Sequence, residues 1–252
     1  MLDRPSFVTT RMPSAGSAVR RLILGLLTVT HAYVTPRVTS HAKNSRLEAE
    51  ATFGMGCFWA PSEALLEVEG VTKTVVGYTG VSERPMEPPS YEDVCFARDW
   101  VEGVRVEYDE QVLPYDKLLD AFFMAQEPKI GSRQYGSFIF PHNAEQEAVA
   151  REWIERNKSQ TRSKDGIPVL LTQIEAKTPF YRAENYHQQY WQKTRPRVAT
   201  MIALLTVGTG VLDDSIPLNY VTAVHTAANS LVLAGLLYVL VERKLDTRVV
   251  EI

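Results

Sequence analysis

Hydrophobic and polar residues alternate in several short stretches through the middle of the chain, as they do in strands with one buried face. Residues 71–78 are rich in strand-forming types, and residues 169–174 are mostly apolar. Within 100–108, Glu102 falls on the same face as Val104, because successive side chains of a strand point to opposite sides. The pattern predicts a sheet built from short strands.

Segments with apolar residues at helical spacing separate these strands. One helix is expected directly after Cys57, and another covers residues 118–123 and ends before Pro128. Asn143 and Gln146 resemble a capping box at the start of a further helix. Strands and helices that alternate along the chain favour an α/β arrangement with helices packed on the sheet.

The C-terminal part, residues 194–252, is apolar in two runs. Residues 198–212 are short for a membrane span of about 20 residues, whereas residues 218–241 are long enough. Asp213 lies in the acidic connection, and basic residues flank the pair on both outer sides. We expect a C-terminal apolar helical hairpin, which is either transmembrane or a soluble pair packed on the domain.

The N-terminal part, residues 1–48, has the composition of a targeting region. Two arginines at 20–21 precede an apolar run at 22–34, which is the layout of a signal peptide. Residues 35–46 are rich in Ser, Thr, Arg and Lys without acidic residues, as in transit peptides. This two-part layout predicts delivery to a plastid, and the alternatives are the secretory pathway and the mitochondrion.

Composition narrows the function classes. The chain of 252 residues has 45% hydrophobic and 23% charged residues, which is typical of a globular protein with room for one domain and appendages. A net charge of -3 argues against general nucleic-acid binding. Two cysteines exclude a disulfide scaffold, and the scattered histidines do not have metal-ligand spacing.

The segment 54–59 carries the candidate chemistry. Cys57 lies between a glycine-rich turn and a predicted helix start, where unpaired N–H groups and the helix dipole lower a thiol pKa. Phe58 and Trp59 add an apolar wall beside the sulfur. The segment suits a nucleophile that attacks a small sulfur compound, and the alternative is a buried structural cysteine.

Gly56 to Trp59 resembles the signature of the A-type peptide methionine sulfoxide reductases. Five further segments resemble that family in the same order, so the resemblance runs from about residue 49 to about residue 191. These segments are Val76–Gly80, Ser90–Cys95, Glu102–Val106, Gln134–Ser137 and Phe180–Tyr190.

The resemblance implies that residues 49–193 form the reductase domain. The implied fold is of the α/β (α+β) class, a two-layer sandwich with a ferredoxin-like βαβ core. The implied activity is the thiol-dependent reduction of L-methionine (S)-S-oxide, in proteins or as the free amino acid. This is antioxidant repair, which restores a methionine side chain.

The resemblance also assigns roles to residues. Cys57 is the nucleophile, and Glu102 is the acid because burial on an apolar strand face would keep it protonated. Tyr91 and Tyr135 donate hydrogen bonds to the sulfoxide oxygen. His187 is expected to be structural and not catalytic.

Phe58 and Trp59 are expected to form a pocket for the substrate methyl group. No metal and no bound cofactor are expected. The chain is expected to be a monomer whose partners are oxidised proteins and a thiol reductant.

Regeneration is constrained by the cysteine count. Attack leaves a sulfenic acid on Cys57, and no cysteine follows Cys95 to resolve it. The reductant is therefore either Cys95 or an external thiol, namely thioredoxin, glutaredoxin or glutathione. A cycle with a single cysteine is the favoured prediction.

The sequence also leaves a second function class open. The chain could be a silent relative that binds methionine-rich partners or anchors a membrane complex. The retained Cys57, Glu102, Tyr91 and Tyr135 favour catalysis, whereas the missing resolving thiols favour the silent relative.

Overall fold

The computed structural model describes residues 48–83, 85, 87–97, 99–162, 166–246 and 248–252. The predicted targeting region lies outside the described residues except for Glu48. One compact unit lies within residues 45–201 and 233–252, and a second contains residues 202–232.

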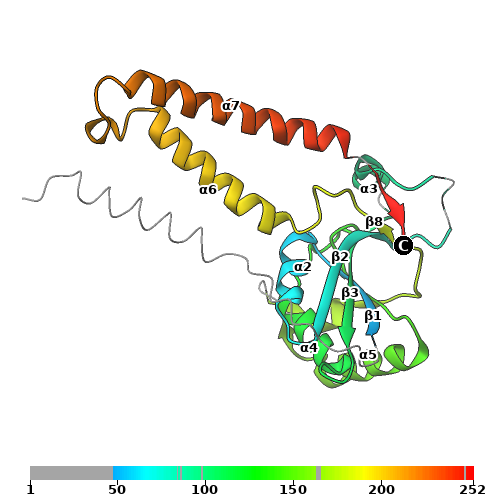
Figure 1. Ribbon diagram of the computed structural model, residues 1–252. Coiled ribbons are helices and arrows are strands. Elements are labelled where there is room, and N and C mark those ends of the chain that lie inside the picture. The colour runs from blue at the N-terminus through cyan, green and yellow to red at the C-terminus, as the bar shows by residue number, and fades with distance from the viewer. Residues whose placement is uncertain (1–47, 84, 86, 98, 163–165, 247) are drawn as a thin grey trace, which may run out of the picture. The chain divides into compact units, whose positions relative to one another are not determined.

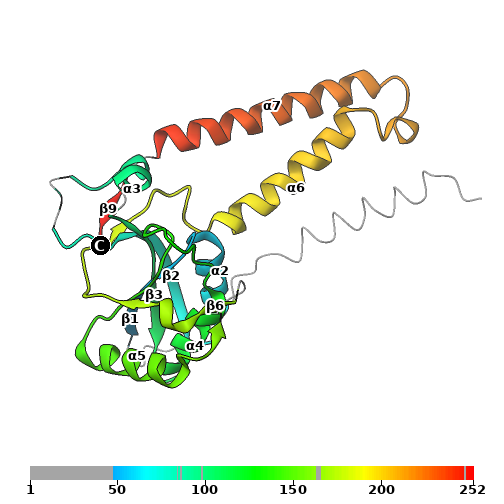
Figure 2. The ribbon, with the colours of Figure 1, turned by 180° about the vertical axis from the view of Figure 1, so that it is seen from behind.

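The first unit contains a seven-stranded sheet with the strand order β7-β4-β1-β3-β2-β8-β9. Only β4 and β7 pair in parallel; the other neighbours are antiparallel. β2, β3 and β1 lie side by side in Figures 1 and 2. The strands are β1 (Glu48–Met55), β2 (Val71–Thr79), β3 (Val101–Asp109), β4 (Ser137–Phe140), β7 (Gln173–Ile174), β8 (Tyr181–Arg182) and β9 (Val250–Glu251). A separate ribbon pairs β5 (Thr161–Arg162) with β6 (Ile167–Pro168).

Three helices form the second layer. They are α2 (Trp59–Leu66), α4 (Tyr115–Ala125) and α5 (Ala144–Asn157). α2 packs on β2 and α4, and α4 packs on β1 and α5. With α2 between β1 and β2, and α4 between β3 and β4, the central order β4-β1-β3-β2 is ferredoxin-like. The predicted two-layer α/β sandwich is confirmed.

Aromatic side chains fill the space between sheet and helices. Phe53 of β1 stacks on Phe122 of α4 with ring centroids 4.8 Å apart, and Phe123 stacks on Trp153 of α5 at 4.2 Å. Such pairs contribute about 0.5–1.5 kcal/mol beyond the area they bury. The predicted cap is present, because the side chain of Asn143 accepts a hydrogen bond from the Gln146 backbone N–H.

The prediction of one strand over residues 169–174 is only partly correct. Val169–Leu171 form a 3-10 turn (η1), closed by a hydrogen bond from the Thr172 N–H to the Val169 carbonyl, and only β7 is extended. Because Pro168 fixes its own φ and leads into this turn, the apolar run changes direction before it reaches the sheet.

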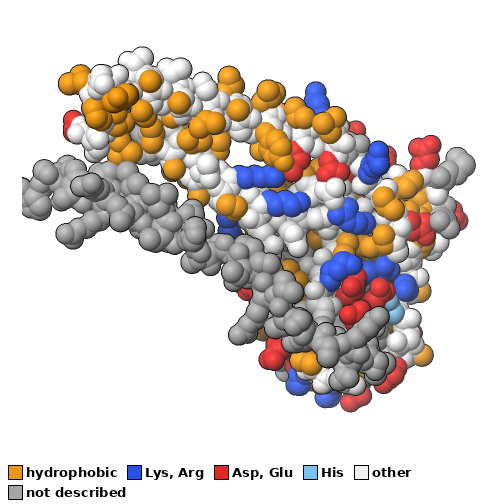
Figure 3. All heavy atoms as spheres, in the orientation of Figure 1, with side chains coloured by type: hydrophobic (Ala, Val, Ile, Leu, Met, Phe, Trp, Pro, Cys, Tyr) orange, Lys and Arg blue, Asp and Glu red, His pale blue; other side chains and the backbone are white. Residues whose placement is uncertain are grey.

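The C-terminal part forms the two predicted helices, α6 (Tyr190–Gly208) and α7 (Val221–Leu245), with a 3-10 turn η2 (Asp213–Ser215) between them. Within the second unit, His225 of α7 contacts Asp213 at 2.7 Å, and the Asn229 side chain donates to the Gly208 carbonyl at 3.3 Å. α7 is the one described helix long and apolar enough to cross a membrane. Apolar side chains cover much of its visible face in Figure 3.

Candidate active site

Cys57 follows the end of β1 on a turn that needs glycine. Gly56 has a φ of +84°, in the left-handed region that favours glycine, and pairs with Glu127 in an isolated bridge. A Cβ at this position would lie 2.0 Å from the Glu127 carbonyl oxygen. Strand, glycine turn and the first residues of α2 together fix where the Cys57 sulfur lies.

Substitution of Gly56→Ala should therefore destabilise the fold and displace the thiol. Alanine at position 56 would have a left-handed backbone conformation, and its Cβ would clash with the backbone of Glu127. The two effects should lower the free energy of unfolding by about 1–3 kcal/mol. Urea unfolding followed by tryptophan fluorescence measures this loss. Gly131→Ala is the matched control, since Gly131 also has positive φ but no atom lies within 4 Å of the place that a Cβ would take there. Equal stability of the two variants would contradict the prediction.

The electrostatics of Cys57 differ from the sequence prediction. Burial raises the pKa of its thiol, the Trp59 backbone N–H that bonds the sulfur lowers it, and the charge of Glu102 raises it again. The net shift is upward, so the predicted lowering of the pKa is wrong. The helix start does supply a donor, but desolvation of the half-buried sulfur outweighs it.

Glu102 lies in β3 with its side chain almost fully enclosed. The residue is 2% exposed, and burial raises its pKa to about 7. One carboxyl oxygen accepts from the Phe58 backbone N–H at 3.3 Å, and the other accepts from the Gln134 side-chain amide at 2.9 Å. The carboxyl thus contacts the residue next to Cys57 and is partly protonated at neutral pH.

The two predicted phenols, Tyr91 and Tyr135, lie at the site that contains Cys57 and Glu102. Tyr91 begins α3 (Tyr91–Ala97), and Tyr135 lies on the loop before β4. Burial raises the pKa of Tyr91, and it raises the pKa of Tyr135 to about 12, with smaller contributions from Glu102, Cys95 and Cys57. Both phenols are therefore protonated donors, and each acts on the pKa of the other. The structure brings all four predicted catalytic residues together.

The loop that carries Tyr135 is fixed from both sides. Arg133 forms an ion pair with Glu175 at 2.8 Å and donates to the carbonyls of Gly80 and Asp99. Lys129 donates its backbone N–H to the Tyr135 carbonyl at 2.8 Å. These bonds tie the loop to β2 and to the segments beside β3 and β7.

Phe58 and Trp59 take different positions. Phe58 is 1% exposed and packs into the core against Tyr78, so it lies behind the surface of the site. Trp59 is half-buried and stacks on Tyr190, the first residue of α6, with ring centroids 3.8 Å apart. Their contact with a substrate methyl group stays a prediction, and Trp59 is the better placed of the two.

His187 occupies the centre of this aromatic group. It is 3% exposed, and burial lowers its pKa to about 4. Its Nδ1 accepts a hydrogen bond from Trp59 Nε1 at 3.0 Å, and its ring packs on Tyr91 and Phe58. A neutral imidazole that orients Trp59 agrees with the expected structural role.

Two residues of the site were not assigned from the sequence. Gln134 donates to Glu102 and lies 3.8 Å from the Cys95 sulfur, and the charge of Lys129 lowers the pKa of both Cys57 and Glu102. Gln134 lies in the segment Gln134–Ser137, which resembles the family, so the sequence could have indicated it as a site residue. The place of Lys129 depends on the loop conformation, which the sequence pattern does not indicate.

Metal binding has no support from the geometry. Across the described ranges, no group of three or more His, Cys, Asp or Glu residues is arranged to hold a metal ion. The reactive groups of the site are a thiol, a carboxyl group that is partly protonated at neutral pH and two phenols. Together they can attack an electrophilic atom and protonate the oxygen bound to it.

Comparison with known proteins identifies the family. The family model described as peptide methionine sulfoxide reductase matches residues 49–207, which extends past the predicted domain boundary at residue 193. Peptide methionine sulfoxide reductase MsrA of Methanothermobacter thermautotrophicus is 41% identical over 170 residues, which are 64% of this chain and 96% of the relative. Peptide methionine sulfoxide reductase A4, chloroplastic, of Arabidopsis thaliana is 42% identical over 57% of this chain and 55% of the relative.

Among solved structures, methionine sulfoxide reductase A of Corynebacterium diphtheriae is 25% identical, covers 61% of this chain and 77% of that chain, and superposes with a TM-score of 0.48. Because the matched region is more than half of the chain and includes the whole candidate site, this chain belongs to the peptide methionine sulfoxide reductase family.

Proposed function

We propose that this chain reduces the S epimer of methionine sulfoxide, in proteins and as the free amino acid, with Cys57 as the nucleophile. Membership of the family supports the activity. The observation that supports the mechanism best is the buried Glu102 carboxyl, with a pKa of about 7, bonded to the residue next to Cys57. No comparison supports the alternative of a silent binding module.

The reaction transfers one oxygen atom. The Cys57 thiolate attacks the sulfoxide sulfur, Glu102 donates a proton to the oxygen, and Tyr91 and Tyr135 donate hydrogen bonds to it as negative charge develops there. The bond between the two sulfur atoms and the sulfur–oxygen bond of the substrate then break as the hydroxyl group passes to the Cys57 sulfur, which leaves methionine and a sulfenic acid on Cys57. The substrate sulfur gains two electrons and the cysteine sulfur loses two, so no bound cofactor is needed.

The ionisations of Cys57 and Glu102 are coupled. The charge of Glu102 is among the causes that raise the Cys57 pKa, so protonated Glu102 makes the thiolate easier to form. The reactive state thus has one proton on the pair, located on Glu102 and not on the sulfur. A proton transfer from Cys57 to Glu102 would produce this reactive state without exchange of protons with solvent.

An external thiol regenerates the enzyme in this proposal. One thiol condenses with the sulfenic acid to a mixed disulfide and releases water, and a second thiol then releases Cys57. The chain has no cysteine after Cys95 that could resolve the sulfenic acid. Both thiols therefore come from thioredoxin, glutaredoxin or glutathione. The chain acts as a monomer.

Turnover with dithiothreitol tests the proposal. The full-length protein should reduce methionine (S)-S-oxide and leave the R epimer unchanged, with methionine quantified by chromatography. A trapping reagent for sulfenic acids should label Cys57 after one turnover without thiol, which mass spectrometry detects. Turnover of neither epimer above the rate in dithiothreitol alone would contradict the proposed activity.

For location, we propose a plastid enzyme that the C-terminal hairpin, residues 194–252, attaches to a membrane. A chloroplastic relative and the length and apolar surface of α7 support this. In the base of the hairpin, Arg197 and Glu242 form an ion pair at 2.7 Å, which keeps these charges paired where the apolar stretches begin. Carbonate extraction of membranes that contain the full-length protein is the test, and release into the soluble fraction would contradict attachment.

A further inference from the structure

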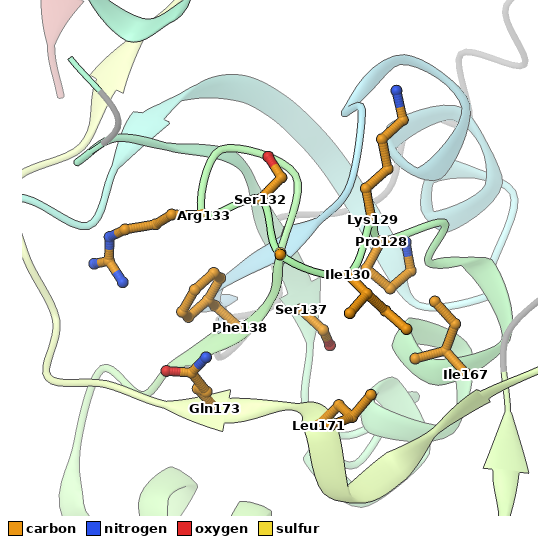
Figure 4. Close-up of a pocket in the computed structure, with 12 residues that line it drawn as sticks. Pro128, Lys129, Ile130, Ser132, Arg133, Ser137, Phe138, Ile167, Leu171 and Gln173 are labelled. Carbon is orange, nitrogen blue, oxygen red and sulfur yellow. The ribbon is translucent and has the colours of Figure 1, made fainter. Parts of the chain in front are cut away.

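A hollow of about 390 Å³ adjoins the loop that carries Tyr135. Loop 128–136 and the start of β4 form one wall, and the segment from β6 to β7 forms the other. In Figure 4, the side chains of Ile130, Ile167 and Leu171 gather at one end of the hollow, away from Arg133. That end therefore has an apolar lining contributed by two separate segments of the chain.

This apolar lining faces solvent in the described structure. Ile130 is 77% exposed and Leu171 is 47% exposed. Scattered exposed apolar residues are common, but here they line one hollow together with Ile167 and Pro128. Apolar side chains grouped in a concave place are typical of ligand sites and docking surfaces.

Lys129 connects the hollow with the catalytic residues. It lines the hollow, and its ammonium group lies 4.7 Å from the centre of the Tyr135 ring. Its charge also acts on Cys57 and Glu102. The hollow and the thiol site therefore adjoin the same loop, and a ligand that extends beyond the thiol site can reach the hollow.

The length of an extended polypeptide suits this arrangement. Such a chain advances about 3.3–3.6 Å per residue, so a side chain within a few residues of the sulfoxide lies several ångströms to one side of it. The free amino acid has no such neighbour. We propose that Ile130, Ile167 and Leu171 form a subsite for an apolar side chain of a polypeptide substrate, close in sequence to its methionine sulfoxide. The proposal rests on the proposed function and specifies its substrate class.

The test compares peptides in which leucine or serine occupies each of the two positions on either side of methionine sulfoxide. At one or more of these positions, the peptide with leucine should have a higher kcat/KM with the wild-type protein than the peptide with serine. Ile130→Ser and Leu171→Ser should lower kcat/KM for that peptide about tenfold, which is typical for an apolar group lost from a pocket. Activity on the serine peptides and on free methionine sulfoxide should stay unchanged.

The matched control is Leu170→Ser. Leu170 is 66% exposed and precedes Leu171, but it does not line the hollow. It should behave as wild type toward every peptide. Its exposure, like that of Ile130, means that the substitution leaves the core intact.

The outcomes separate the subsite from the activity. Turnover of all substrates without a preference for leucine, or equal losses in all three variants, would overturn the subsite and leave the proposed function standing. No turnover of any substrate by the wild-type protein would overturn both. Dimers in analytical ultracentrifugation that Ile130→Ser abolishes, with peptide kinetics unchanged, would assign the surface to self-association and also overturn the subsite.

Discussion

Replacement of Cys57 by serine is expected to abolish sulfoxide reduction, with a loss of at least about 10³-fold in kcat. A serine hydroxyl is not ionised near neutral pH and attacks sulfur far less readily than a thiolate. It also cannot accept the oxygen atom as a sulfenic acid. The measurement is dithiothreitol-driven formation of methionine from the S epimer.

Cys95→Ser is the matched control for this variant. Cys95 is the other cysteine of the chain, is also half-buried, and lies near Tyr91 and Gln134. If regeneration depends on external thiols, this variant should keep turnover close to the wild-type rate with dithiothreitol or a thioredoxin system. A loss as large as that of Cys57→Ser would contradict the single-cysteine cycle, and retained activity in Cys57→Ser would remove the nucleophile from the mechanism.

The position of Glu102 could be predicted because it depends on a local rule. Alternation along β3 places its carboxyl on the face shared with Val104 and Val106 of the main core, and burial then raises the pKa. The pKa of Cys57 could not be predicted in this way. Its direction depends mainly on how much protein surrounds the sulfur, and this burial outweighs the donor at the local helix start; a carboxyl 45 positions away in the sequence adds a further rise.

Elements that depend on tertiary pairing were also missed. β9 is two residues long and exists because it pairs with β8, with a further bond from the Ile252 N–H to the Phe180 carbonyl. α3 is short and its pattern is weak, although Ser90 and Asp93 cap it with reciprocal hydrogen bonds. This Ser–Asp pair is a signal that sequence reading could have used.

Trp59 likewise could be predicted as a site residue from the sequence, whereas its orientation could not. Its place directly after the Cys57 motif marked it as a site residue, but its orientation comes from His187 and Tyr190, more than 125 positions later in the chain. No periodicity connects these segments. The family resemblance identified both segments as related to the site, while only the structure shows that the histidine bonds the indole and the tyrosine covers it.

The second large effect is expected for Glu102→Gln, which should lower kcat/KM about 10²–10⁴-fold. The amide has nearly the same shape but has no acidic proton to give to the sulfoxide oxygen. It can still accept one hydrogen bond, from the Phe58 backbone or from Gln134. Glu107→Gln is the matched control, because Glu107 lies in the same strand but pairs with Lys73 at the surface.

The pH profile identifies the cause of the loss. In the wild type the reactive state carries one proton on the Cys57–Glu102 pair, so kcat/KM should rise up to about pH 7, where the pair loses its first proton. It should fall at alkaline pH, above the ordinary pKa of a thiol, where the pair loses its second proton. In Glu102→Gln only the thiol titrates, so the alkaline fall should disappear. The thiol pKa should also be lower than in the wild type, because the carboxylate that raises it is gone.

Stability gives an independent measurement on the same variant. The folded-state pKa of Glu102 is about 7 and its ordinary value is 4.5, so the native state binds this proton more tightly than the unfolded chain. Its contribution to the unfolding free energy should therefore decrease as pH rises from about 4.5 to about 7. Glu102→Gln should lose that decrease in urea unfolding, whereas Glu107→Gln should keep it. Identical pH dependence in wild type and Glu102→Gln, for both activity and stability, would exclude a buried, protonated Glu102 as the acid.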